Sequence, residues 1–179
     1  MKGESDSSYL AGAAAHEVGM TIFDGIALRK KTLPPGTFKI PHTITAGLSG
    51  VVFFTGDGFS PEAAIFKAGD RHIAMGRISL LKMKDTKKGV VTGVVYKPVT
   101  GGKLVEHIGI AALYRDERVS FMKDGVASSF VTDDRGSYTG ELPGGDYTVM
   151  PDGSNKRKVI VGPGRTTIIN FKKGMVLVD

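Results

Sequence analysis

Apolar and polar residues alternate at every second position over much of this chain, in short runs separated by turn residues. The alternation is clearest at residues 108–114, where four side chains fall on one face of an extended strand: Ile108, Ile110, Ala112 and Tyr114. Turn sequences such as Asp24-Gly25 interrupt the runs. This pattern predicts an all-β fold built from many short strands.

Strands are predicted in both halves of the chain. In the first half they fall at residues 20–23, 26–29, 37–40, 51–55, 65–66, 72–75 and 77–83. In the second half they fall at residues 90–96, 108–114, 119–122, 126–132, 137–141, 146–150, 158–161, 166–171 and 175–178. A single helical turn is predicted at residues 60–64, where Ser60 can cap a helix that begins with Pro61.

A polar segment divides the two sets of strands. Residues 84–89 read KDTKKG, which has no apolar anchor and is typical of a linker. The sequence therefore predicts a β-rich docking domain at residues 20–83, folded as a small β-barrel or sandwich. It predicts a β-sandwich of the transthyretin-like or immunoglobulin-like kind at residues 90–179.

Residues 1–19 are predicted to form an N-terminal arm. The segment is either a short helix over residues 9–18 or an extended strand that lies across a neighbouring molecule. Its sizeable apolar groups after the initial methionine are few: Tyr9, Leu10 and Val18. Ordering each backbone residue costs roughly 1 to 2 kcal/mol, so these three residues are candidate contacts with a partner in an assembly.

Residues 131–149 are predicted to form two short strands and two turns. Asp133 and Gly136 are typical of a tight turn, because an Asp side chain bonds nearby backbone amides and glycine takes positive φ without a steric cost. In the second turn Pro143 presets φ and Gly145 permits the reversal. Three apolar residues of this stretch are predicted to be core or turn residues: Tyr138, Leu142 and Tyr147.

These residues carry a family resemblance. Gly93-Val94-Val95, the run at 108–114, the pattern T-D-x-x-G-x-Y at 132–138 and the pattern L-P-x-G-x-Y-x-V at 142–149 together resemble the carboxypeptidase regulatory-like domain, a transthyretin-like β-sandwich. The resemblance covers the second half of the chain and implies a role as an appended spacer or interaction domain. It carries over no catalytic residue, because it concerns the accessory domain and not the zinc peptidase that the domain sometimes accompanies.

The net charge of +6 comes from small basic clusters at residues 29–31, 82–88, 156–158 and 172–173. Such clusters are typical of solvated strand ends and linkers, and docking onto an acidic protein surface is the alternative. They lack interleaved aromatic residues and any nucleic-acid-binding motif, so nucleic acid is not expected as a partner. The chain has no cysteine and can form neither a disulfide nor a thiolate metal site.

No catalytic, cofactor-binding or metal-ligating residue is predicted. The four histidines are far apart in the sequence and none has a zinc-binding spacing: His16, His42, His72 and His107. Ser49 lacks the full G-x-S-x-G elbow of a hydrolase. The aspartates at positions 57, 70, 133, 134 and 152 lack a calcium-loop sequence around them.

These features predict a non-catalytic structural subunit of a large assembly. The first interpretation is a virion protein of the phage head, tail or decoration type, which contacts copies of itself or another structural protein of the particle. The alternative is an exported bacterial surface or filament subunit, or an extracellular adhesion module that binds glycan or protein. The apolar tail at residues 175–178 is expected to complete its own sheet or to pair with a neighbouring subunit.

Two further features bear on where the protein is expected to reside. No run approaches the roughly 20 apolar residues that span a bilayer, so membrane insertion is not expected. The first 19 residues include three acidic side chains and no apolar core, and therefore do not resemble a secretory signal.

Overall fold

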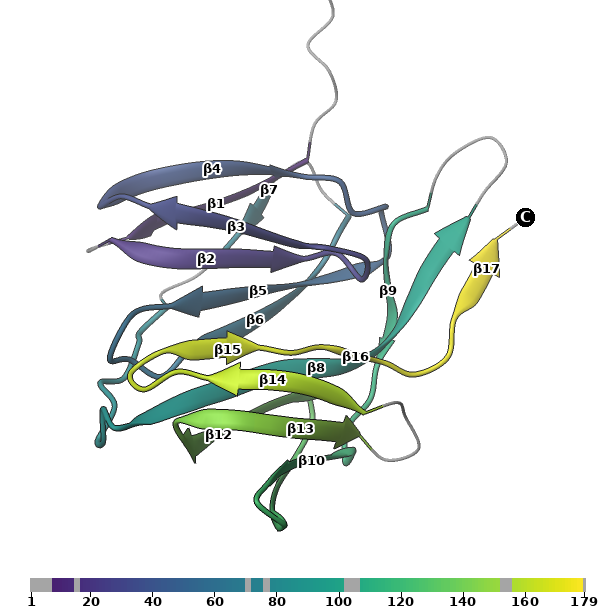
Figure 1. Ribbon diagram of the computed structural model, residues 1–179. Helices are drawn as coiled ribbons and strands as arrows, with labels where there is room; N and C mark the ends of the chain where they lie inside the picture. Colours follow the sequence, from purple (N-terminus) through teal and green to yellow (C-terminus); the bar gives the residue numbers. More distant parts are fainter. Residues whose placement is uncertain are drawn as a thin grey trace, which may run out of the picture.

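The computed structural model describes residues 8–14, 17–69, 72–75, 78–101, 107–151 and 156–178, and every regular element in these segments is a β-strand. The strands form a three-stranded, a four-stranded and a ten-stranded sheet. Figure 1 shows the strands stacked in layers, with β1 and β4 at one end of the molecule and the β10 hairpin at the other. The all-β fold predicted from the alternation is confirmed.

The first half of the chain is a sandwich of two layers. One layer is the three-stranded sheet, in the order β4 (Gly36–His42), β1 (Ser8–Ala14) and β7 (His72–Ala74). The facing layer belongs to the ten-stranded sheet and contains β2 (Val18–Phe23), β3 (Leu28–Leu33), β5 (Ser49–Thr55) and β6 (Glu62–Lys67). Apolar side chains from both layers meet in a first core, which includes Leu10, Met20, Ile22, Val52 and Phe54.

The second half is also a sandwich. One layer is the four-stranded sheet, in the order β11 (Val126–Val131), β10 (Arg118–Lys123), β13 (Gly145–Pro151) and β14 (Arg157–Val161). The facing layer contains β8 (Lys88–Gly101), β12 (Ser137–Pro143) and β15 (Thr166–Ile168). The second core lies between them, and the Phe121 ring is central to it, with ring contacts to Phe130, Tyr138 and Tyr147.

Strand β8 is paired on both of its edges and joins the two sandwiches. On one side it pairs antiparallel with β12 and then with β9 (Gly109–Leu113), which meets β5 through the pair Ser49↔Ile110. On the other side it pairs parallel with β15, β16 (Phe171–Lys172) and β17 (Val176–Val178). The C-terminal strand therefore completes a sheet of its own chain, one of the two alternatives expected from the sequence.

A third group of buried side chains, which we call the shared core, lies between the two halves. From the first half it receives Phe23, Val51, Phe53 and Ala63, and from the second half Val94, Tyr96 and Ile110. Because successive residues of a strand point to opposite faces, β5 sends Val52 and Phe54 into the first core and Val51 and Phe53 into the shared core. The rings of Phe23 and Tyr96 meet edge to face across it, with their centroids 4.8 Å apart.

The predicted N-terminal arm is wrong for residues 8–14. Strand β1 pairs with β4 along its full length, from Ser8↔His42 to Ala14↔Gly36, and Leu10 is fully buried in the first core. The same chain supplies the backbone partners and the apolar contacts that an external surface was expected to supply. The alternative of a helix over residues 9–18 is therefore also wrong; residues 1–7 and 15–16 lie outside the described residues.

Two further elements differ from the prediction in the first half. No helical turn forms at residues 60–64, because β6 begins at Glu62 and is buried on both faces, with Ala63 in the shared core and Ala64 against the first core. The strand predicted at 77–83 is absent from its described part, residues 78–83, which makes only an isolated bridge between Phe59 and Lys82. At residues 60–64 the burial of β6 between the two cores outweighs the local helix propensity.

The second half shows one interruption and one extension. The strand predicted at 166–171 is divided into β15 and β16, and at the break the Asn170 side-chain oxygen accepts a hydrogen bond from the Val94 backbone N–H at 3.0 Å. The strand predicted to end at Tyr96 continues to Gly101 through a bulge between Lys97 and Pro98. Its continuation is stabilised by pairing with β9 and β17.

The predicted linker is short in the structure. Lys88 opens β8, and only the preceding residues form a turn, in which the Asp85 side chain accepts a hydrogen bond from the Lys87 N–H at 2.9 Å. The division of the chain into domains at residues 84–89 stays a prediction. The shared core gives a physical reason to expect that the two halves unfold together.

Candidate functional site

The turn between β11 and β12 is organised by the side chain of Asp133. Its Oδ1 accepts hydrogen bonds from the backbone N–H groups of Arg135 and Ser137, both at 3.0 Å, and the Ser137 hydroxyl donates to the same atom at 3.1 Å. Gly136 has φ of 75°, and a Cβ at this position would lie 2.7 Å from the Cβ of Leu113. The turn chemistry is the kind predicted from the sequence.

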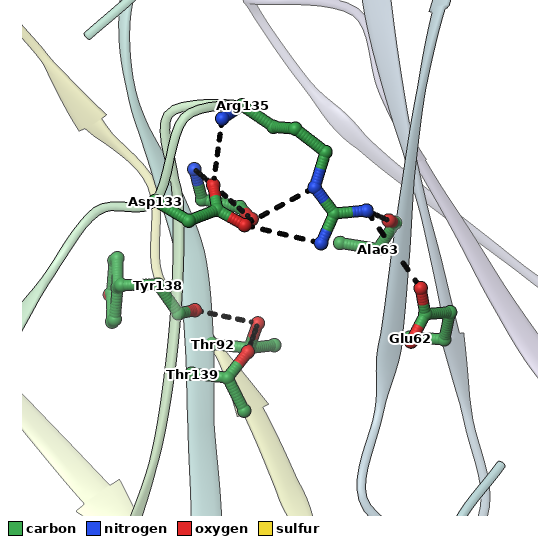
Figure 2. Close-up of polar contacts among 8 residues, drawn as sticks. Glu62, Ala63, Thr92, Asp133, Arg135, Tyr138 and Thr139 are labelled. Carbon is green, nitrogen blue, oxygen red and sulfur yellow. Dashed lines mark hydrogen bonds and ion pairs between the residues drawn. The ribbon is translucent and has the colours of Figure 1, made fainter. Parts of the chain in front are cut away.

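Arg135 extends from this turn to the first half of the chain, as Figure 2 shows. Its guanidinium forms an ion pair with Asp133 at 3.1 Å, donates to the Ala63 carbonyl at 3.4 Å and lies 3.9 Å from a carboxylate oxygen of Glu62. Ion pairs between half-exposed side chains contribute little to stability. We therefore infer that Arg135 fixes the orientation of the turn against β6 at the margin of the shared core.

The pKa of Asp133 reflects this hydrogen bonding. Its partial burial would raise the pKa, but hydrogen bonds from Ser137 and Arg135 favour the charged form more strongly and hold the pKa below its ordinary value of 3.8. A carboxylate whose pKa is lower in the folded state stabilises the protein above the pKa of the unfolded state. That stabilisation is lost as the pH falls through the folded-state pKa.

We expect Asp133→Asn to lower the free energy of unfolding by about 1 to 2 kcal/mol at neutral pH, because the hydrogen bonds to the charged group weaken. The difference from the unsubstituted protein should shrink as the pH falls below the ordinary value of 3.8. Urea denaturation over this acid range measures it. Asp134→Asn is the matched control, because the hydrogen bonds and the ion pair of this turn are made by the Asp133 carboxylate. A pH-independent difference for Asp133→Asn would contradict the assignment.

Tyr138 is a buried structural residue. Its ring is 2% exposed in the second core, and its hydroxyl donates to the carbonyl of Ile169 at 2.7 Å, at the break between β15 and β16. Burial raises the pKa of this hydroxyl far above its ordinary value, so the group is a neutral hydrogen-bond donor. Thr92 binds the neighbouring backbone, donating to the Tyr138 carbonyl at 2.9 Å (Figure 2).

The remaining residues of the 142–149 pattern also have structural positions. Leu142 and Tyr147 are buried in the second core, and the Tyr147 hydroxyl donates to the Pro143 carbonyl at 2.9 Å. Pro143 ends β12 rather than lying in the turn, and Gly145 opens β13 with φ of 142°. These contacts assign the pattern to the connection between β12 and β13, which belong to the two facing sheets, and to the packing of the second core.

The three candidates from the predicted arm do not lie together on a free surface. Leu10 is in the first core, and the Tyr9 ring packs under the ammonium of Lys39 at 4.0 Å from its centroid. Val18 opens β2 and lines a pocket of about 710 Å³ at the end of the first core, beside Leu33, Phe38 and Phe54. Residues 15–16 and 76–77 adjoin this lining in sequence and lie outside the described residues, so we assign it no ligand.

The polar residues considered for chemistry stay dispersed. Among the described residues no three His, Asp or Glu side chains come together as a metal site requires. His42 packs against the Phe66 ring and accepts a hydrogen bond from the Ile44 N–H at 3.3 Å, and burial lowers its pKa. His16, Asp70 and Asp152 lie outside the described residues. No helix long and apolar enough to cross a membrane occurs in the described part of the chain.

Among the terminal strands of the three sheets, β11 is the long one that carries neither charge nor proline, since β7, which is also terminal and uncharged, has three residues. Terminal strands of native sheets carry charges or proline, which discourage pairing with another chain. Four edge strands follow this rule, through Arg29, Lys30 and Lys31 in β3, Lys39 and Pro41 in β4, Glu141 and Pro143 in β12, and Arg157 and Lys158 in β14. Edge strand β11 reads VASSFV, with neither charge nor proline.

Sequence reasoning placed a strand at residues 126–132 without identifying it as an edge. The absence of charge was visible in the sequence, but the pairing order that leaves β11 at the end of its sheet is a tertiary property. The exposed backbone of β11 is therefore the candidate interaction site of the described residues.

Comparison with known proteins gives no family assignment. No family model and no curated protein sequence matches the chain. Three solved structures resemble 97% of it at low identity. The TIE protein of Bacillus anthracis has 14% identity and a TM-score of 0.37, a minor pilin of Streptococcus agalactiae 12% and 0.32, and a leucine-rich repeat protein of Bacteroides thetaiotaomicron 12% and 0.35.

The chain spans 41%, 98% and 27% of those three proteins, respectively. At these TM-scores the likeness carries no argument about activity or partners. The resemblance to the carboxypeptidase regulatory-like domain is not addressed by any of these comparisons and stays a prediction.

Proposed function

We propose that this chain is a non-catalytic structural subunit of a larger assembly. The observation that supports the proposal is the shared core, in which Phe53 of β5 and Val94 of β8 are both fully buried. Together with the ten-stranded sheet that runs through both halves, it makes the two sandwiches one packed body. Such a body suits a protein that holds a fixed shape between its partners.

The use of the polar residues agrees with this role. Asp133, Thr92 and Tyr138 each form a hydrogen bond with a backbone group of their own chain, and these bonds fix a turn, a strand pair and a strand break. Groups engaged in this way stabilise the fold. We further propose that the second half of the chain is a carboxypeptidase regulatory-like sandwich, used as a spacer or interaction domain.

Two settings satisfy the proposal, and they differ in where the protein resides. In the first it is a virion protein of the head, tail or decoration type. In the second it is a subunit of an exported surface structure or filament, or an adhesion module. The virion and the filament both require many copies in a regular arrangement and contact through protein surfaces.

Quantitative mass spectrometry of fractions from the native source tests the proposal. Purified virions, detached surface filaments, cell envelope and soluble lysate should be compared for the amount of this chain relative to the principal structural protein of each fraction. We expect a constant ratio to one such protein in one of the particle fractions. Recovery of the chain mainly as unassociated protein in the soluble lysate would contradict the proposal.

A further inference from the structure

The hairpin of β10 and β11 determines which backbone groups of β11 are free. Its turn has two residues, Asp124 with φ of 50° and Gly125 with φ of 79°, and Lys123 pairs with Val126. In such a hairpin the pair that flanks the turn is hydrogen-bonded, and bonded pairs then alternate along the strands. Residues 126, 128 and 130 therefore bond to β10, and Ala127, Ser129 and Val131 direct their N–H and C=O groups outward.

The outward edge of β11 is uncharged and carries two exposed valines. Val126 is 70% exposed and Val131 is 53% exposed, although both are large apolar residues. The strand has six residues, whereas the uncharged strands β15 and β17 have three. Short strands present little edge for pairing, so β11 is the described strand whose edge is both long and free of charge and proline.

We propose that β11 pairs antiparallel with β11 of a second copy, which joins the two four-stranded sheets into one. We assign β11 of a second copy as the partner strand, because an uncharged edge pairs best with another edge that carries no charge. The edges of β3, β4, β12 and β14 would each bring charged side chains or proline into the junction. A two-fold contact uses the same strand of both copies and closes on itself.

The side chains favour a two-fold axis at Ser128. Only registers that pair odd-numbered residues with odd-numbered residues let the outward backbone groups bond to one another. An axis at Ser129 would place Val126 opposite Thr132 of the second copy, which lies beyond the end of β11. An axis at Ser128 instead places Val126 opposite Phe130 of the second copy, which covers the exposed valine.

The inference rests on the proposed function, since it names the partner through which the subunit assembles. Single cysteines are clean probes because the chain has none of its own. On oxidation, Ser128→Cys should give a disulfide-linked dimer at least about tenfold more readily than Ser120→Cys, because opposed residues across the axis are within disulfide reach. Ser120 is the matched control, since it lies one strand inward, opposite Ser129 in the register.

A second variant keeps the test decisive if a cysteine perturbs the fold. Ala127→Pro removes an outward N–H and no bond to β10, so it should leave the melting temperature near that of Ala127→Val. Sedimentation should show a dimer for the full-length protein and for Ala127→Val, and a loss of dimer for Ala127→Pro. A monomeric full-length protein, or a dimer that Ala127→Pro leaves intact, would overturn the inference. Neither outcome changes the fractionation result, so a failure here is distinct from a failure of the proposed function.

Discussion

Replacing Gly93 by alanine is expected to lower the free energy of unfolding by about 3 kcal/mol or more, because the new methyl group has no space. Gly93 lies in the middle of β8, and a Cβ there would overlap the carbonyl group of Ile169. That carbonyl is held in place by the hydroxyl of Tyr138, and the Ile169 N–H donates to the carbonyl of Thr92 at 2.8 Å. The alanine therefore displaces a hydrogen-bonded backbone rather than a mobile side chain.

Gly69→Ala is the matched control for this substitution. Gly69 has no heavy atom within 4 Å of an added Cβ. Alanine there should change the free energy of unfolding by less than about 1 kcal/mol, as surface substitutions do. Denaturant unfolding of both variants measures the difference. A Gly93→Ala protein as stable as Gly69→Ala would show that β8 and residue 169 are further apart than the structure places them.

Phe53→Ala is expected to cost about 3 to 5 kcal/mol, the range for removing a fully buried aromatic ring. The Phe53 side chain is 0% exposed and belongs to the shared core, with Val94 and Tyr96 of β8. Its loss opens a cavity between the halves, so near-ultraviolet spectra and side-chain resonances of both sandwiches should change. Phe59→Ala is the control, because Phe59 is 40% exposed. Destabilisation confined to residues of the first half would contradict the shared core.

Local chemistry could be predicted from the sequence. The turn at Asp133 depends on an Asp side chain that accepts hydrogen bonds from the backbone amides two and four residues later, so all its partners lie within one short stretch of sequence. The period of two predicted most strands of the second half, because one face of each strand packs on the second core. In the first half, the Val51–Phe54 run is apolar at four consecutive positions, which is a sequence signal of burial on both faces.

Contacts between distant segments could not be predicted in this way. Residues 8–14 have too little apolar surface to order themselves, and the prediction of an arm followed from that fact alone. Their partners, β4 and β7, come from later in the chain, and no local pattern in β1 identifies them. The need for glycine at position 93 has the same origin, because the Ile169 carbonyl that requires it lies far along the sequence.

Calorimetric unfolding of the full-length protein tests most directly the claim that the two sandwiches form one body. Because the halves share a buried core and a continuous sheet, we expect a single transition whose calorimetric and van't Hoff enthalpies agree. Two resolved transitions, or a calorimetric enthalpy well above the van't Hoff value, would contradict the claim.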